Sequence, residues 1–329
     1  MRVPFEVLRD ELLKALLKLG FEPERAGLCA RLFAETTRDG VYTHGLNRFP
    51  RFVAMIRNGS VDVAARPERV AGAGALERWD GHHGPGNLNA HACMERAIAL
   101  AREHGIGCVA LANTNHWMRG GTYGWQAAEA GVIGICWTNT QANLPPWGGT
   151  QARLGNNPLV IAVPRASGHV VLDIAMSQFS YGSLAGYRQR LEPLPVAGGF
   201  DAEGNLTRDA AAIEQTQRAL PIGYWKGSGL SMMLDMVAAM LSGGLATYQL
   251  PADALRETGQ SQVLIAANPS HFGGSDVADG IVAFVQSSAP VEKGRRVRYP
   301  GEQTLKTRME NMELGVPVDE EVWRQLLAV

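Results

Sequence analysis

Helix-spaced hydrophobic residues occupy both ends of the 329-residue chain and enclose a middle region in which strand and helix patterns alternate. The first helix is carried by apolar residues at 3/4 spacing: Phe5, Leu8, Leu12, Leu16 and Leu19. Further helices follow before residue 60, and two helices end the chain. We therefore predict a helical unit made of residues 1–68 and 302–329, joined to an α+β region of residues 69–301.

The middle region contains strand patterns at 69–79, 106–112, 132–138, 159–163, 169–174 and 263–267. The segments 159–163 and 169–174 flank the turn sequence Ala166-Ser167-Gly168, so we expect them to pair. Helices are predicted at 87–104, 121–130, 227–241 and 277–287, and a long polar loop at 191–208. In the N-terminal part, a third helix is predicted to begin near His44 and to end at Asn58-Gly59.

The charge balance and the cysteine pattern restrict the class of partner and the compartment. The 31 Lys and Arg residues against 32 Asp and Glu give a net charge of −1, which argues against a nucleic-acid binder. No apolar core of signal-peptide length follows Met1, and the weakly charged stretch 227–245 is too polar to span a membrane. The widely spaced cysteines indicate a reduced, cytoplasmic protein with buried thiols: Cys29, Cys93, Cys108 and Cys136.

The common signatures of nucleotide and hydrolase sites are missing. Gly227 and Gly229 supply only the first two glycines of a GxGxxG motif, and the sequence contains no Walker A or GxSxG motif. His82, His83 and His91 show no metal-ligand spacing with carboxylates, so we expect them to be solvated and expect no bound metal.

The segment Thr43-His44-Gly45-Leu46-Asn47-Arg48 places an imidazole at a predicted helix start, with an arginine one turn later on the same face. A histidine can give and take a proton near neutral pH, and an arginine can bind a carboxylate through two hydrogen bonds. The alternative interpretation is a capping histidine next to a surface arginine.

Two further segments combine polar, basic and aromatic residues. The stretch 113–121, which contains His116, follows a predicted strand, and loops of this kind often contact ligands. The alternative for His116 is a solvated loop histidine. Tyr224-Trp225-Lys226 precedes an apolar helix, whose free N–H groups would suit a phosphate together with Lys226. A simple glycine and serine cap explains the glycines there, but not the adjacent Trp225 and Lys226.

Asp173 interrupts the apolar strand 170–174, where an unpaired buried carboxylate would be costly. We expect it to accept a hydrogen bond from a histidine or from a ribose. Its role would then be to orient an imidazole or to touch a cofactor.

Several segments become recognisable when they are taken together: Thr-His-Gly-Leu-Asn-Arg-Phe-Pro (43–50), Asn-His-Trp-Met-Arg-Gly-Gly (115–121), Pro-Pro-Trp-Gly (145–148), Gly-Asn-Asn-Pro (155–158) and Gly-Tyr-Trp-Lys-Gly-Ser-Gly (223–229). They resemble the malate/L-lactate dehydrogenase-like oxidoreductases that lack a Rossmann fold. The resemblance extends from the N-terminus to the last predicted helix. Its tryptophan-containing segments point to the branch of the family that acts on diketo sugar acids.

The resemblance implies an α+β fold and a homodimer. The nicotinamide-binding domain would be of the non-Rossmann type, with a largely antiparallel sheet flanked by helices. The resemblance also implies that His44 is the proton donor in ketone reduction, and we expect Arg48 or His116 to orient the substrate carboxylate. The cofactor contacts carried over by position are His169, Val170, Val171, Leu172, Asp173, Ile174, Ala175, Trp225, Lys226, Gly301, Glu302 and Gln303.

Two departures from the family pattern affect these assignments. Most of the family has Gly-Thr-Asn-Pro where this chain has Gly155-Asn156-Asn157-Pro158, a change that could alter a hydrogen bond to substrate or cofactor. The hairpin at 165–169 also carries an extra residue, which shifts the assignment of 169–175 by about one position.

The resemblance therefore implies an NADH-dependent reductase, with NADPH as the alternative cofactor, acting on a 2-oxo or 2,3-diketo acid such as 2,3-diketo-L-gulonate. Within the same class, the alternatives are a dehydrogenase of malate, lactate or ureidoglycolate, or a reductase of a cyclic imino acid. The alternative from a different class is a catalytically silent ligand-binding protein. We expect the partner to be a small-molecule keto acid, with neither nucleic acid nor membrane involved.

Overall fold

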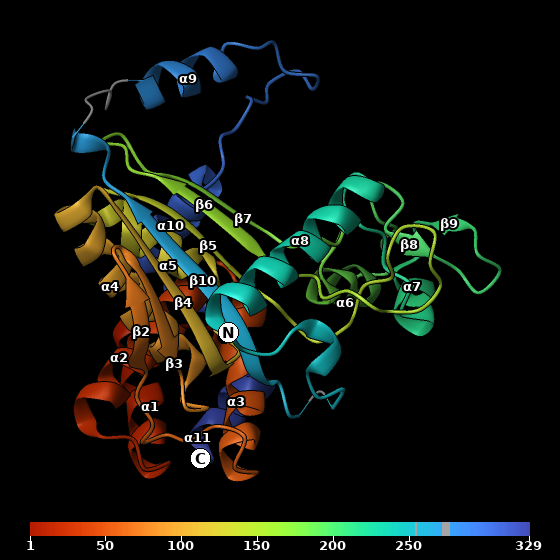
Figure 1. Ribbon diagram of the computed structural model, residues 1–329. Helices are drawn as coiled ribbons and strands as arrows, with labels where there is room; N and C mark the ends of the chain where they lie inside the picture. The colour runs from red at the N-terminus through yellow and green to blue at the C-terminus, as the bar shows by residue number, and fades with distance from the viewer. Residues whose placement is uncertain (254, 272–276) are drawn as a thin grey trace.

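The computed structural model describes residues 1–253, 255–271 and 277–329, and its centre is a seven-stranded sheet (Figure 1). The strands are β2 (Glu68–Ala73), β3 (Leu76–Asp80), β4 (Ile106–Asn115), β5 (Ile133–Thr138), β6 (Leu159–Val163), β7 (Val170–Ile174) and β10 (Thr258–Ala267). Their order is β2-β3-β4-β10-β5-β6-β7, and in the described part of the chain only β3 and β4 pair in parallel. The predicted largely antiparallel sheet is confirmed, as is the pairing of 159–163 with 169–174.

Helices cover both faces of this sheet: α4 (Gly86–His104) and α5 (Gly121–Glu129) on one face, α8 (Trp225–Ser242) on the other. The alternation of side chains along a strand decides which residue meets which layer. Val109 and Leu111 of β4 pack with α4 and α5, whereas Ala110 between them packs with Leu234 and Ala238 of α8.

The helices of the two chain ends share one apolar core. These helices are α1 (Phe5–Lys18), α2 (Pro23–Arg38), α3 (Phe49–Arg57), α10 (Glu302–Leu314) and α11 (Glu320–Leu327). β1 (Arg2–Val3) pairs with β11 (Val316–Pro317), and the core shared by both ends includes Leu8, Phe33 and Leu326. Burying this apolar face is what holds the C-terminal helices against the N-terminal ones.

Three local expectations need correction. The segment 69–79 is the hairpin β2–β3 and not one strand, because the chain reverses at Gly74, which adopts a left-handed φ of 59°. The segment 191–208 contains the short strands β8 (Gly199–Phe200) and β9 (Leu206–Thr207). The third correction concerns the histidines that we expect to be solvated: His82 and His83 are exposed, but His91 is half-buried.

The remaining helices are α6 (Tyr181–Gln189), α7 (Ala210–Thr216) and α9 (Val277–Gln286), and α9 stands clear of the sheet (Figure 1).

Candidate active site

A cavity of about 840 Å³ lies where the helical unit meets the sheet. Its wall includes His44 and Arg48 from the N-terminal part, His116 from the loop after β4, and Asp173 close to the end of β7. Segments far apart in the sequence are thus brought to one place, because α2 packs on α4 and the N–H of Val171 in β7 donates to the carbonyl of Pro300 just before α10. A volume of this size is typical of a site for a small ligand and a cofactor.

The chain around His44 forms two short 3-10 turns, η1 (Tyr42–His44) and η2 (Leu46–Arg48), and the helix α3 begins only at Phe49. The expected helix start at His44 is therefore wrong by several residues. The backbone N–H of Leu46 donates to the Thr37 hydroxyl at 2.8 Å, which binds this segment to α2. Both His44 and Arg48 still line the cavity.

His44 and His116 stack, with ring centroids 5.8 Å apart and planes inclined by 23°. The backbone N–H of Met118 donates to His116 Nδ1 at 3.0 Å, so the neutral His116 carries its proton on Nε2. His44 Nδ1 lies 3.0 Å from the Thr43 hydroxyl. Each imidazole therefore has one nitrogen held by the protein and the other available to a ligand.

Both histidines are disposed to be neutral. Burial, and then the positive charges of Arg48 and Arg119, lower the pKa of His44 to about 4. Burial, followed by Arg48 and the neighbouring His44, lowers the pKa of His116 well below its ordinary value. A negative charge bound in the cavity would oppose the Arg48 effect and favour a proton on His44.

Glu257 lies opposite the arginines and was not found from the sequence. Its carboxylate bonds Arg48, lies 3.1 Å from Arg51 Nη2, and places Oε1 at 3.9 Å from His116 Nε2. Arg51 follows Arg48 by one helical turn, a spacing that could have identified it. No local pattern marks Glu257, because it reaches the site only through the pairing of Thr258 in β10 with Asn115 in β4.

The expected cofactor strand contributes part of its length to the cavity. Val171, Leu172, Asp173 and Ala175 line the cavity, whereas His169, Val170 and Ile174 do not. The two-residue repeat of a strand accounts for Val170 and Ile174 facing away from Val171 and Asp173, but Leu172 lines the cavity as well. His169 Nδ1 instead accepts the N–H of Arg165 in the preceding turn at 3.1 Å.

The side chain of Asp173 is exposed to the cavity. Its Oδ2 accepts the N–H of Gly121 at 2.8 Å, so its partner in this structure is the start of α5 and not a histidine. Partial loss of water at the cavity wall raises the pKa of Asp173, and this effect outweighs the lowering effects of Arg119 and of the Gly121 hydrogen bond.

The other expected cofactor residues lie in two places. Gly301 lines the cavity at the start of α10, and Thr304 joins it from the next turn. Glu302 bonds Arg296, and Gln303 accepts a hydrogen bond from Arg298 at 2.8 Å. These last two side chains are thus held by neighbouring arginines and do not line the cavity.

Trp225 and Lys226 lie outside the cavity, exposed in the first turn of α8. The N–H groups of Lys226 and Gly227 already donate to carbonyls of the preceding turn, at 3.2 and 2.8 Å. The expected phosphate cradle therefore lacks these backbone donors. The turn is nevertheless next to the loop that borders the cavity, since Trp147 donates its N–H to Ser228 Oγ at 3.0 Å.

Asn156, at which this chain departs from the family pattern, lies in the cavity wall. Asn156 Oδ1 accepts the hydroxyl of Thr140 at 3.0 Å, and Asn157 Oδ1 accepts the backbone N–H of Thr140 at 2.9 Å. Asn156 thus presents an amide at the position where the resemblance implies a threonine hydroxyl, whereas the Asn157 amide donates to Ser231 and holds the backbone.

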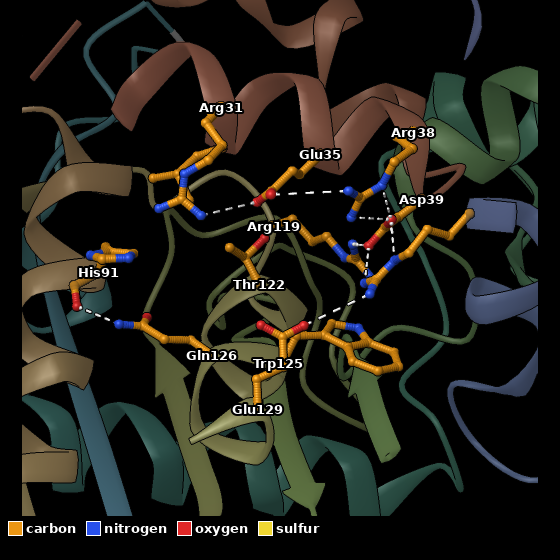
Figure 2. Close-up of a pocket in the computed structure, with 12 residues that line it drawn as sticks. Arg31, Glu35, Arg38, Asp39, His91, Arg119, Thr122, Trp125, Gln126 and Glu129 are labelled. Carbon is orange, nitrogen blue, oxygen red and sulfur yellow. Dashed lines mark hydrogen bonds and ion pairs between the residues drawn. The ribbon is translucent and has the colours of Figure 1, made fainter. Parts of the chain in front are cut away.

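A second, smaller cavity of about 130 Å³ shares Arg119 and Trp125 with the first. Figure 2 shows the Asp39 carboxylate in it, beside the guanidinium groups of Arg38 and Arg119. Asp39 is 5% exposed and accepts bonds from Arg119 at 2.7 Å and from Arg308 of α10 at 2.8 Å. Burial alone would raise the pKa of Asp39, but the Arg308 bond and the charges of Arg119 and Arg38 hold it below its ordinary value. This network fixes Arg119 and α10 at the edge of the larger cavity.

Among the described residues, no group of three or more His, Cys, Asp or Glu side chains is arranged to hold a metal ion. In the same part of the chain, no helix combines the length and the apolar character that crossing a membrane would require. Three of the four free cysteines are buried and Cys108 is half-buried.

Comparisons with known proteins agree with the geometry. Residues 3–327 match the family described as malate/L-lactate dehydrogenase. A 2,3-diketo-L-gulonate reductase of Citrobacter koseri is 46% identical over the full length of both chains. The sulfolactate dehydrogenase of Methanocaldococcus jannaschii has a TM-score of 0.91 at 28% identity, covering 99% of this chain and 95% of that one. The malate dehydrogenase of Pyrococcus horikoshii has a TM-score of 0.89 at 26% identity, covering 99% and 93%.

Proposed function

This chain belongs to the malate/L-lactate dehydrogenase family, and on that premise we propose that it reduces 2,3-diketo-L-gulonate with His44 as the proton donor. It is an oxidoreductase of hydroxy and keto acids that depends on a pyridine nucleotide. The observation that carries the proposal is the convergence of His44, Arg48 and His116 on one cavity. The full-length similarity to a reductase of that name supports the choice of substrate.

The residues present suit a pyridine dinucleotide. Val171, Asp173 and Ala175 form one wall, and Gly301 and Thr304 place the start of α10 at the same cavity. A helix N-terminus favours phosphate groups, because its N–H groups and its dipole attract negative charge. When bound, the reduced nicotinamide would supply the hydride. We propose NADH as the reductant, and NADPH is the alternative that the same assay compares.

His44 would hold and deliver the proton in this reaction. A carboxylate bound by Arg48 offsets the positive charge that disfavours the imidazolium form, so the proton is available when the substrate is in place. His116, with its proton on Nε2, would donate a hydrogen bond that orients the second substrate oxygen. In the reverse direction the neutral His44 would act as the base.

We also propose that residues 1–68 and 302–329 act as one unit that carries His44 and Arg48, and that residues 69–301 supply the cofactor wall. Trp225 and Lys226 remain proposed cofactor contacts. Their position beside the loop 141–149 supports this, since Gln141 and Asn143 at the start of that loop line the cavity and Trp147 later in it bonds Ser228.

We infer that the protein is a homodimer. Large apolar side chains stay exposed along α9, where Phe284 is 81% exposed, and along α8, where Met240 is 76% exposed. Large apolar side chains exposed along a helix are typical of a protein–protein interface. We further propose a cytoplasmic location, because the free thiols persist in a reducing compartment.

The test is a panel of diketo sugar acids, simple 2-oxo acids and cyclic imino acids, each followed by the loss of NADH or NADPH absorbance. We expect the highest kcat/KM with 2,3-diketo-L-gulonate and NADH. A different acid at the top of the panel would replace the substrate proposal, whereas no turnover of any acid would contradict the enzyme itself. Light scattering of the same preparation tests the dimer.

A further inference from the structure

We propose that Glu257 selects the charge of the substrate, so that the cavity accepts a 2-oxo acid with one carboxylate and rejects one with two. The inference rests on the proposed function, because it concerns the carboxylate that Arg48 would bind. It goes further by naming a residue that decides between classes of acid.

Glu257 reaches the site through the sheet. It directly precedes β10, and the register of that strand sets Thr258 against Asn115, the residue before His116. The carboxylate is only 11% exposed and contacts Arg48 and Arg51 while facing His116 Nε2 at 3.9 Å. A carboxylate so placed is a fixed part of the wall and not a mobile surface group.

The charges at this end of the cavity therefore leave one net positive charge. Arg48 and Arg51 contribute two positive charges, and Glu257 contributes one negative charge. The remaining charged residues of the wall are Arg119 and Asp173, whose charges are of opposite sign and offset each other in this count. The pKa of His44 and the pKa of His116 are both lowered, which favours the uncharged form of each imidazole.

One net positive charge is suited to one carboxylate. A second carboxylate would lose its water without gaining a cation, and it would be repelled by Glu257 at short range. Two negative charges a few ångströms apart in a partly buried site repel by enough to change an affinity by about tenfold or more. The wall thus excludes dicarboxylates by an unfavourable charge, whatever the shape of the rest of the acid.

The test uses oxamate and oxalate, which have nearly the same shape but carry one and two negative charges. Their dissociation constants are measured on the NADH-loaded protein by quenching of tryptophan fluorescence. We expect the wild type to prefer oxamate and Glu257→Gln to shift the ratio toward oxalate by about tenfold. Glu257→Asp keeps the charge and should keep the preference for oxamate.

Matched controls separate this effect from a loss of structure. Glu77 is also buried and bound by two arginines, Arg69 at 3.2 Å and Arg96 at 2.7 Å, but it lies outside the cavity, so Glu77→Gln should leave the ratio unchanged. Arg51→Gln removes a positive charge from the same wall and should shift the ratio in the opposite direction, away from oxalate. This second variant keeps the test decisive if Glu257→Gln does not fold.

An unchanged oxamate-to-oxalate ratio in folded Glu257→Gln would overturn the inference, even if the enzyme reduces diketo acids as proposed. The opposite combination of results can also be told apart from a failure of the inference. If no keto acid is reduced but the ratio shifts as expected, Glu257 still sets the charge preference and only the proposed reaction fails.

Discussion

The imidazole of His44 stacks on that of His116 at a centroid distance of 5.8 Å, in a cavity where Arg48 is bound by Glu257. This arrangement holds two imidazoles beside one guanidinium, the groups that we propose deliver the proton and bind the substrate carboxylate. Because these side chains are in contact, each proposed role is tested by its own substitution.

Replacing His44 with Gln should reduce kcat by about 100- to 10,000-fold, the usual contribution of a positioned proton donor. The dissociation constant of NADH should change little, because the cofactor wall is formed by β7 and α10. Steady-state kinetics and fluorescence titration measure both quantities. His104→Gln, at the exposed end of α4, is the matched control and should retain full activity. Full activity in folded His44→Gln would refute the assignment.

Binding of a carboxylate should make the protein take up a proton. In the free enzyme the pKa of His44 is about 4, lowered by burial and then by Arg48 and Arg119. A bound carboxylate offsets the Arg48 charge and raises the pKa toward the ordinary value of 6.5, so His44 gains a proton at intermediate pH. Calorimetry of oxamate binding at about pH 5.5, in buffers of different ionisation enthalpy, measures the uptake. The uptake should vanish in His44→Gln; wild-type binding without uptake would contradict the account.

Replacing Arg48 with Met should raise the KM for the keto acid by about 10- to 100-fold, since a hydrogen bond to a charged group contributes roughly 1.5–3 kcal/mol. kcat at saturating substrate should fall less. Arg48→Lys keeps the charge but loses the two-pronged geometry, so it should give an intermediate KM. Equal KM values in wild type and Arg48→Met would place the carboxylate elsewhere in the cavity.

Replacing Asp39 with Asn should lower the free energy of unfolding by about 3–5 kcal/mol, because it leaves buried arginine charges without their carboxylate. Urea denaturation at neutral pH measures this loss. In the wild type, the pKa of Asp39 lies below its ordinary value of 3.8, so its contribution is complete above that pH and is lost only at lower pH. Glu310→Gln removes an exposed ion pair with Arg2 and should change stability by no more than about 0.5 kcal/mol.

Replacing Gly86 with Ala should disturb the His116 loop. A Cβ atom at this position would lie 2.2 Å from the carbonyl oxygen of Asn115 and 2.4 Å from that of His116. The loop must move, so we expect both lower stability and lower kcat/KM. Gly27→Ala in α2 meets no atom within 4 Å and should stabilise the helix by about 0.5–1 kcal/mol. Wild-type activity in Gly86→Ala would show that the loop tolerates the shift.

The sequence predicted the regular elements well where periodicity was strong. Helices such as α4 and strands such as β5 were placed within a residue or two, because their apolar spacing is local. The hairpin β2–β3 was missed because a single glycine reverses an otherwise continuous strand pattern. The start of α3 was placed too early, since the 3-10 turns around His44 depend on contacts with α2.

The candidate site, like the fold, was predicted where the signal is local and missed where it depends on tertiary contacts. His44, Arg48 and His116 could be proposed from the sequence, because proton-transfer and carboxylate-binding groups stood in loops beside regular elements. Position in the family pattern assigned the whole segment 169–175 to the cofactor, but it did not indicate that only Val171, Leu172, Asp173 and Ala175 of this segment would line the cavity. Glu257 could not be found, because its position depends on the pairing of two strands that are distant in the chain.

The sequence alone therefore determined the chain's elements, its resemblance to a family and the types of chemical group available to the site. The tertiary structure decided which of these groups share a cavity and what charge they present together. The physical reason is that periodicity is encoded by neighbours in the chain, whereas burial and electrostatic interaction depend on neighbours in space. Glu257 and the pair His44–His116 acquire their properties only when β10, β4 and the N-terminal helices meet.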